Sequence, residues 1–141
     1  MSELRQDPTT YDWIIIAKER AKRPHEFRSG ITKKPLPAHE KDCPFCPGNE
    51  NKTPDASAVY GDPVKWEIRV VPNKYAALIP EGDTTREEWK LFRKTQGYGR
   101  HEVVIETPSH NTFIPFMEDV HVIDLIKAYR DRYHAQKWIP I

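Results

Sequence analysis

Two cysteines, Cys43 and Cys46, lie in the short run CPFCPG. Two thiolates three positions apart on a turn can bind the same Zn²⁺ ion, which prefers four nitrogen or sulfur ligands in a tetrahedron. A disulfide and a redox pair are the alternatives for this spacing. A disulfide is disfavoured because cytoplasmic thiols stay reduced, and the flanking prolines and glycine are typical of a tight turn rather than of a redox motif where a strand feeds a helix. The run therefore favours a metal-binding turn.

Histidines from elsewhere in the chain are expected to complete this site, since two thiolates and two neutral imidazoles balance the charge of the ion. His110 is the first candidate because it follows a predicted strand through Pro108 and Ser109, in a loop that could close back on the turn. Taken singly, the cysteines could form an unligated surface turn and His110 could bond to backbone. The other candidate ligands are His25, His39, His101, His121 and His134.

Arg20 and Arg23 form a second cluster in the run RAKRP, directly after a predicted strand. Arginines three positions apart on a loop can both bind one phosphate, because each guanidinium offers a planar fork of donors. The alternative is a solvated basic loop, which charge runs of this kind commonly form. Composition alone favours that alternative.

Asn73 lies in the run VVPNKYAAL, behind a proline at the end of a predicted strand. Binding groups are often carried on loops that a rigid sheet holds in place, so this amide is well placed to hydrogen-bond a sugar or a base. The run GYGRHE carries two glycines, which allow backbone to approach a ligand closely. Each of these two signals is weak by itself.

The composition indicates one modest domain spanning residues 1–141. The chain has 141 residues, 38% of them hydrophobic, which is within the size range of a single domain. Its 22 lysines and arginines nearly balance 21 aspartates and glutamates, so the net charge of +1 gives no general attraction to nucleic acid or to an anionic membrane. No apolar run approaches the roughly 20 residues of a membrane span, and the N-terminus lacks a secretory signal. We expect a cytoplasmic protein.

Three segments are predicted to be strands, at residues 11–17, 66–71 and 101–107, because they are rich in β-branched and aromatic residues. A short helix over residues 85–93 is indicated by a capping-box spacing at its start. From Asp119 the apolar period changes to three or four residues, which predicts an amphipathic helix ending near residues 138–140. The apolar face of that helix comprises Val122, Ile126, Tyr129 and Tyr133, with Leu125 beside them.

Several strands followed by one long helix imply an α+β domain, with an antiparallel sheet covered on one face. The 13 prolines, about twice the average usage, predict ordered loops between short elements, and residues 30–42 are the expected exposed loop. The predicted helix runs into apolar residues at the very end of the chain, where folded domains usually fray into polar sequence. We therefore expect the chain to be part of something longer.

In combination, these runs resemble the N-terminal half of galactose-1-phosphate uridylyltransferases and their relatives in the histidine-triad superfamily. The runs occur in family order over nearly the whole chain, which is far more specific than any single motif. The fold implied by the resemblance is a histidine-triad-like half-barrel domain. The matching stretches are LRQDPTTYDWIIIAKERAKRP, CPFCPGNE, WEIRVVPNKYAAL, GYGRHEVVIETPSH and the AYRDRY helix.

The resemblance also implies roles for particular residues. Cys43, Cys46 and His110 match three ligands of a structural Zn²⁺ site. Arg20 and Arg23 match a pair that contacts substrate phosphate from the neighbouring subunit of a homodimer. The positions matched to contacts with the nucleotide are Phe45, Asn73 and Lys74.

The activity implied by the resemblance is transfer of UMP between UDP-glucose and galactose 1-phosphate, through a uridylyl-histidine intermediate. In the family, the fourth zinc ligand and the nucleophile are the two histidines of a His-Pro-His motif beyond the position equivalent to Ile141. This sequence contains no His-Pro-His, so we expect it to hold no nucleophile and to be inactive alone. The alternatives are a sugar-nucleotide phosphorylase or adenylyltransferase on the same scaffold, or a non-enzymatic zinc-binding module.

Overall fold

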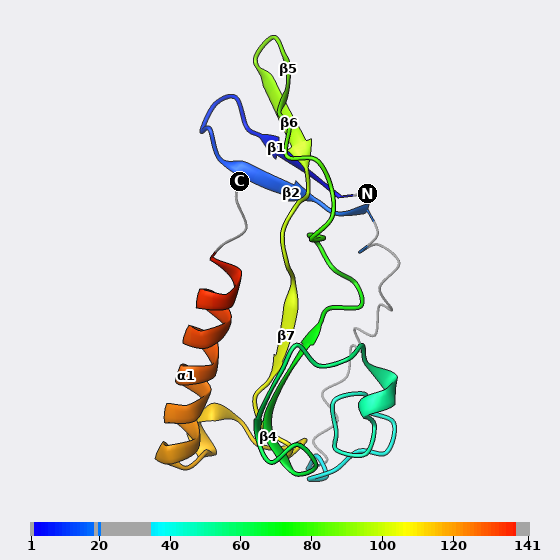
Figure 1. The fold of residues 1–141 in the computed structure, drawn as a ribbon, viewed down its shortest axis with the longest axis vertical. Coiled ribbons are helices and arrows are strands. Elements are labelled where there is room, and N and C mark those ends of the chain that lie inside the picture. The colour runs from blue at the N-terminus through cyan, green and yellow to red at the C-terminus, as the bar shows by residue number, and fades with distance from the viewer. Residues whose placement is uncertain (1, 19, 21–34, 138–141) are drawn as a thin grey trace. The chain divides into compact units, whose positions relative to one another are not determined.

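The structure is a computed structural model that describes residues 2–18, 20 and 35–137 (Figure 1). These residues fall into two compact units, one formed by the described residues up to 20 together with 75–101, the other by 35–74 together with 102–137. The cysteine run and His110 both belong to the second unit. Among the described residues, no helix is both long and apolar enough to cross a membrane.

The first unit contains a four-stranded antiparallel sheet in the order β2-β1-β6-β5. Its strands are β1 (Glu3–Gln6), β2 (Trp13–Ile16), β5 (Glu87–Trp89) and β6 (Phe92–Gln96). Strand β1, which the sequence pattern did not predict, lies inside the sheet, because it pairs with both β2 and β6. The strand predicted over residues 11–17 is confirmed by β2.

The helix predicted over residues 85–93 is wrong, because this segment forms the hairpin of β5 and β6. Thr85 does not cap a helix; its hydroxyl and backbone N–H both donate to the Asp83 carboxylate, at 2.6 and 2.8 Å. Two cross-strand ion pairs join the strands, and the Trp89 and Phe92 rings stack with centroids 5.9 Å apart. Cross-strand pairs of this kind stabilise a hairpin. Here they stabilise the hairpin more than a capping box would stabilise a helix in the same segment.

The second unit contains a three-stranded antiparallel sheet in the order β3-β4-β7. Its strands are β3 (Ala58–Gly61), β4 (Trp66–Pro72) and β7 (Glu102–Ile105). The strands predicted over residues 66–71 and 101–107 are therefore confirmed. Of the elements that the structure describes, the central strand β4 is the most buried, as expected for a strand with neighbours on both sides.

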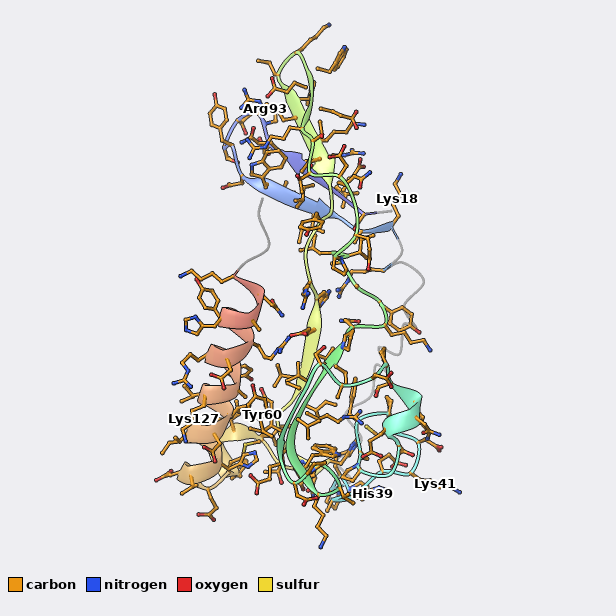
Figure 2. All side chains as sticks on the ribbon, viewed as in Figure 1. Lys18, His39, Lys41, Tyr60, Arg93 and Lys127 are labelled. Carbon is orange, nitrogen blue, oxygen red and sulfur yellow. The ribbon has the colours of Figure 1, made fainter. Side chains whose placement is uncertain are left out.

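Helix α1 (Asp119–Gln136), which follows the short 3₁₀ helix Ile114–Phe116, packs on the sheet of the second unit. Ile68 of β4, fully buried, contacts Leu125 and Ala128 of α1. Tyr60 packs against the same cluster, and Figure 2 labels it on this side of the sheet. The long C-terminal helix predicted from the sequence is thus confirmed, ending at Gln136 instead of near residues 138–140.

Only part of the predicted apolar face of α1 packs, namely Leu125 and the half-buried Val122. Leu125 and Ala128 are the buried residues of the helix, whereas Ile126 and Tyr133 are 60% and 66% exposed. The packed stripe continues into polar residues: His121, Arg132 and Gln136 all hydrogen-bond to the strand β7 or the segment just after it. A search for apolar residues alone therefore selects the neighbouring stripe, at Val122, Ile126, Tyr129 and Tyr133.

A second buried cluster lies on the other side of β4. Side chains alternate along a strand, so Val71 faces away from Ile68 and packs with Ile105 of β7. Trp66, next to an irregularity in the pairing of β3 with β4, joins that cluster and is 4% exposed. The loop with the short 3₁₀ helix η2 (Glu50–Lys52) is bonded to this region of β4. The segment that carries the two cysteines is therefore attached to the buried centre of the sheet.

Candidate metal centre

Cys43, Cys46 and His110 come together in the second unit. One ligand atom from each residue lies within 4.8 Å of the other two, and Cys46 Sγ is 3.5 Å from His110 Nδ1. Cys46 is buried and the other two residues are partly buried. Within the part of the chain that the structure describes, this is the one group of three or more side chains arranged to hold a metal ion.

The backbone of the cysteine turn is held by a short ladder of hydrogen bonds. The Cys46 N–H donates to Cys43 O at 3.3 Å, and the Asn49 N–H donates to Cys46 O at 3.2 Å. The Asn49 side-chain amide also donates to Cys43 O and to Lys41 O, at 2.8 and 3.0 Å. Gly48 has a φ of 87°, a conformation that residues other than glycine adopt at a cost. The CPFCPG run thus forms the predicted tight turn, and the thiol sulfurs of Cys43 and Cys46 lie within 4.8 Å of each other.

Residues 36–40 join the cysteine turn to the loop that bears His110. The His110 N–H donates to Ala38 O at 2.8 Å, and the Asn111 side chain donates to Leu36 O at 3.0 Å. On the other side, the Glu40 N–H donates to Cys46 Sγ at 3.4 Å. His110 follows β7, so it is positioned by the sheet on one side and by this segment on the other.

The other candidate histidines have different partners. His39, labelled in Figure 2, has its Nε2 2.9 Å from Pro47 O, so this nitrogen donates to the cysteine turn and cannot bind a metal at the same time. His121 Nε2 lies 2.7 Å from Glu106 O. His101 Nδ1 accepts the Ala77 N–H at 3.0 Å, in the first unit. His134 packs edge-on against the neighbouring Tyr133 ring. His25 lies outside the described residues.

The chemistry of the three side chains fits zinc. Two thiols and one imidazole are the soft, nitrogen-and-sulfur donor set that zinc prefers, and a fourth ligand would complete a tetrahedron. Burial raises the pKa of the Cys46 thiol, because the low-dielectric surroundings penalise the charged form, while the Glu40 N–H opposes that effect. A divalent cation would reverse the balance, since a coordinated thiol is deprotonated.

The predicted substrate-binding residues occupy several places. Phe45 lies within the cysteine turn and is 40% exposed. Asn73, half-buried, and Lys74, exposed, follow directly after β4 in the same unit. Arg20 belongs to the first unit, where its N–H donates to Ala17 O at 3.1 Å, and Arg23 lies outside the described residues.

The chain is similar to proteins of known function along nearly all of its length. The family described as "Galactose-1-phosphate uridyl transferase, N-terminal domain" matches residues 1–139. An ADP-glucose phosphorylase of Arabidopsis thaliana is 38% identical over 133 residues, covering 92% of this chain and 38% of that protein. A galactose-1-phosphate uridylyltransferase of Saccharomyces cerevisiae is 28% identical over 160 residues, covering 99% of this chain and 42% of that protein. The chain therefore spans less than half the length of these relatives.

Solved structures support the same relationship. The crystal structure of an ADP-glucose phosphorylase from Arabidopsis thaliana with bound ADP-glucose matches 96% of this chain and 38% of that one, with a TM-score of 0.57 and 32% identity. A galactose-1-phosphate uridylyltransferase-like protein from the same plant matches 94% of this chain and 35% of that one, with a TM-score of 0.57 and 29% identity. The predicted α+β, histidine-triad-like fold, with antiparallel sheets and one C-terminal helix, is confirmed.

Proposed function

The chain belongs to the galactose-1-phosphate uridyl transferase family by a match to its N-terminal domain, and on that premise we propose that it is the zinc-binding N-terminal part of a nucleotidyltransferase of galactose metabolism. The observation that carries the proposal is that Cys43, Cys46 and His110 lie within 4.8 Å of one another in a chain of this family. The proposed reaction transfers UMP between UDP-glucose and galactose 1-phosphate, in the cytoplasm.

The proposed reaction is a double displacement. A histidine on the C-terminal part of the enzyme attacks the α-phosphorus of UDP-glucose, the bond to glucose 1-phosphate breaks, and a uridylyl-histidine forms. A phosphate oxygen of galactose 1-phosphate then attacks that phosphorus, which releases the imidazole and yields UDP-galactose. Because this chain has no His-Pro-His, it supplies supporting residues instead of the nucleophile.

Arg20 and Arg23 are proposed to bind the substrate phosphates, where their guanidinium groups would offset the charge that develops on the phosphoryl oxygens. In a homodimer, these arginines would act in the site of the neighbouring subunit. Phe45, in the cysteine turn, is proposed to contact the base. Asn73 and Lys74, which directly follow the buried strand β4, are proposed to lie beside the nucleotide.

Cys43, Cys46 and His110 would hold the zinc ion as a structural site. When bound, the ion would cross-link the cysteine turn to the loop after β7, and the fourth ligand would come from the part of the enzyme that bears the nucleophile. The fixed turn would in turn hold Phe45, which lies between the two cysteines, in one place.

The alternative is an enzyme of the ADP-glucose phosphorylase type. It is favoured by a specific observation, the 38% identity to the Arabidopsis thaliana ADP-glucose phosphorylase. Such an enzyme would use an adenine nucleotide, and the acceptor of the nucleotidyl group would be phosphate in place of a sugar phosphate. A non-enzymatic zinc-binding module is the remaining alternative.

The metal site is tested by measuring zinc content after purification and dialysis. The unaltered chain should retain about one zinc ion per molecule, and Cys43→Ala and His110→Ala should each lose most of it, because two protein ligands bind zinc far more weakly than three. His134→Ala is the matched control, since His134 is an exposed histidine of α1 whose ring packs against the neighbouring Tyr133. Full zinc retention by both ligand variants would show that the site is assigned to the wrong residues.

A further inference from the structure

Glu50 lies between the metal-binding turn and the sheet and touches both. Its Oε1 accepts the Gly48 N–H of the turn at 3.2 Å and the Trp66 Nε1–H of strand β4 at 2.9 Å. Gly48 is two residues from Cys46, whereas Trp66 belongs to the buried core and is 4% exposed. One carboxylate oxygen therefore connects the turn to the centre of the second unit.

A second contact reinforces the first. Arg69 of β4 is 4% exposed, and its guanidinium donates to Thr53 Oγ1 at 2.8 Å while lying 5.5 Å from the centroid of the Trp66 ring. Thr53 Oγ1 donates in turn to Glu50 O at 2.9 Å. The Trp66 hydrogen bond, and to a lesser degree the positive charge of Arg69, lower the pKa of Glu50. The carboxylate is thus ionised at neutral pH and suited to hold two N–H donors.

Strand β4 is the common support for the two halves of the metal site. Through Glu50 it fixes the turn that carries both cysteines, and through its pairing with β7 it fixes the start of the loop that carries His110. A metal site needs its ligands placed to within a fraction of an ångström, and residues that hold the ligands commonly contribute 10- to 100-fold to metal affinity.

We infer that Glu50 is a positioning residue for the metal site, acting with Trp66 to hold the cysteine turn against β4 at the distance from His110 that metal binding requires. Residue spacing does not indicate this role, because Glu50 is four residues from Cys46 and its partner Trp66 is sixteen residues further along the chain. The inference rests on the proposed zinc site.

The test is the zinc dissociation constant of the full chain, measured by competition with a chromophoric chelator. Glu50→Ala should weaken zinc binding by about 10- to 100-fold, whereas Glu50→Gln, which keeps an acceptor oxygen, should recover most of the affinity. Trp66→Phe keeps the ring in the core and removes the donor, so it should weaken binding in the same direction and serves if Glu50→Ala fails to fold. The variant that carries both Glu50→Ala and Trp66→Phe should lose less zinc-binding free energy than the sum of the two single losses, because both substitutions remove the same hydrogen bond.

Glu67→Ala is the matched control, since Glu67 is an exposed carboxylate on β4 beside Trp66. It should leave zinc affinity unchanged. Unaltered zinc affinity in both Glu50→Ala and Trp66→Phe would overturn the role of Glu50 and leave the proposed zinc site standing. An equal loss of affinity in Glu67→Ala would also overturn that role, because it would indicate a general effect of charge. If the unaltered chain bound no zinc, the proposed metal site would fail and the inference with it.

Discussion

At the scale of single residues, Tyr129 offers a prediction about alkaline pH. Burial, together with the hydrogen bond from its hydroxyl to Glu106 Oε1 and the charge of that carboxylate, raises the pKa of Tyr129 from 10.0 to about 12. A pKa raised on folding means that the protonated hydroxyl stabilises the folded chain fully below pH 10, the unfolded value, and that this contribution is lost as the pH rises through about 12.

Tyr129→Phe should therefore lose less stability than the unaltered chain between pH 9 and pH 12. Because Tyr129 is 42% exposed, solvent screening should keep the difference to less than about 1 kcal/mol. Urea unfolding of both proteins at the two pH values measures it, and subtraction removes the titration of other groups. A difference that grows in favour of the unaltered chain at high pH would contradict the assigned hydrogen bond.

Sequence could predict the residues of the candidate site only where their spacing is local or where the resemblance supplies it. Cys43 and Cys46 are recognisable from their spacing in a proline-flanked turn, and His110 was first among six histidines because it follows a strand. Glu50 was not predicted, because its role depends on Trp66, which approaches it only in the folded chain. Long-range partners of this kind carry no periodic or spacing signal.

At the scale of elements, α1 is fixed to β7 by a largely buried ion pair. The Arg132 guanidinium donates twice to the Glu102 carboxylate, at 2.7 and 2.9 Å, and the two side chains are 15% and 9% exposed. Gln136 adds a third bond to Glu102 at 2.7 Å. Burial disfavours ionisation of Glu102, but the hydrogen bonds, with that from Arg132 the largest, lower its pKa.

Arg132→Leu should cost about 3 kcal/mol of unfolding free energy, because it leaves a buried carboxylate without its cation, a change that typically costs about 3–5 kcal/mol. Arg130→Leu is the matched control, since Arg130 pairs with Asp131 at the surface, with exposures of 62% and 45%, and should change stability by less than about 1 kcal/mol. Urea unfolding at neutral pH measures both variants. Equal losses in the two would show that helix propensity, and not the buried pair, is responsible.

The elements were predictable where one physical signal dominates. Strands β2, β4 and β7 coincide with runs of β-branched and aromatic residues, and α1 begins where the spacing of apolar residues changes to three or four. The segment at 85–93 was assigned to the wrong class because a capping box is a local signal, whereas the hairpin depends on cross-strand pairs such as Trp89 with Phe92. The packed face of α1 was predicted only in part, at Leu125, because polar residues such as Arg132 extend that face and apolar periodicity does not indicate them.

At the scale of the whole molecule, the proposed function predicts that this chain alone turns over no sugar nucleotide. Purified residues 1–141 should show no exchange of label between UDP-glucose and glucose 1-phosphate, since the proposed nucleophile is absent from them. Exchange above the rate of a Cys43→Ala control would show that a residue within the chain is the nucleophile.

The nucleotide preference of the complete enzyme separates the two enzymatic proposals. With UDP-glucose and ADP-glucose supplied together, a uridylyltransferase should consume the uracil nucleotide first and require galactose 1-phosphate as acceptor. Preferential consumption of ADP-glucose with phosphate as acceptor would replace the uridylyltransferase proposal by the phosphorylase alternative. The family assignment and the zinc site would stand in either case.

Strand β2 affects how the chain is expected to self-associate in solution. Among the described strands it has a neighbour on one side only, and its residues Trp13–Ile16 include Ile14 and Ile15 at 50% and 45% exposure. No proline or charge interrupts this stretch, so the backbone groups on the edge that no other described strand pairs form a template for the same strand of another molecule. We expect any self-association of concentrated samples through strand pairing to begin there, and light scattering before and after an Ile15→Lys substitution measures it.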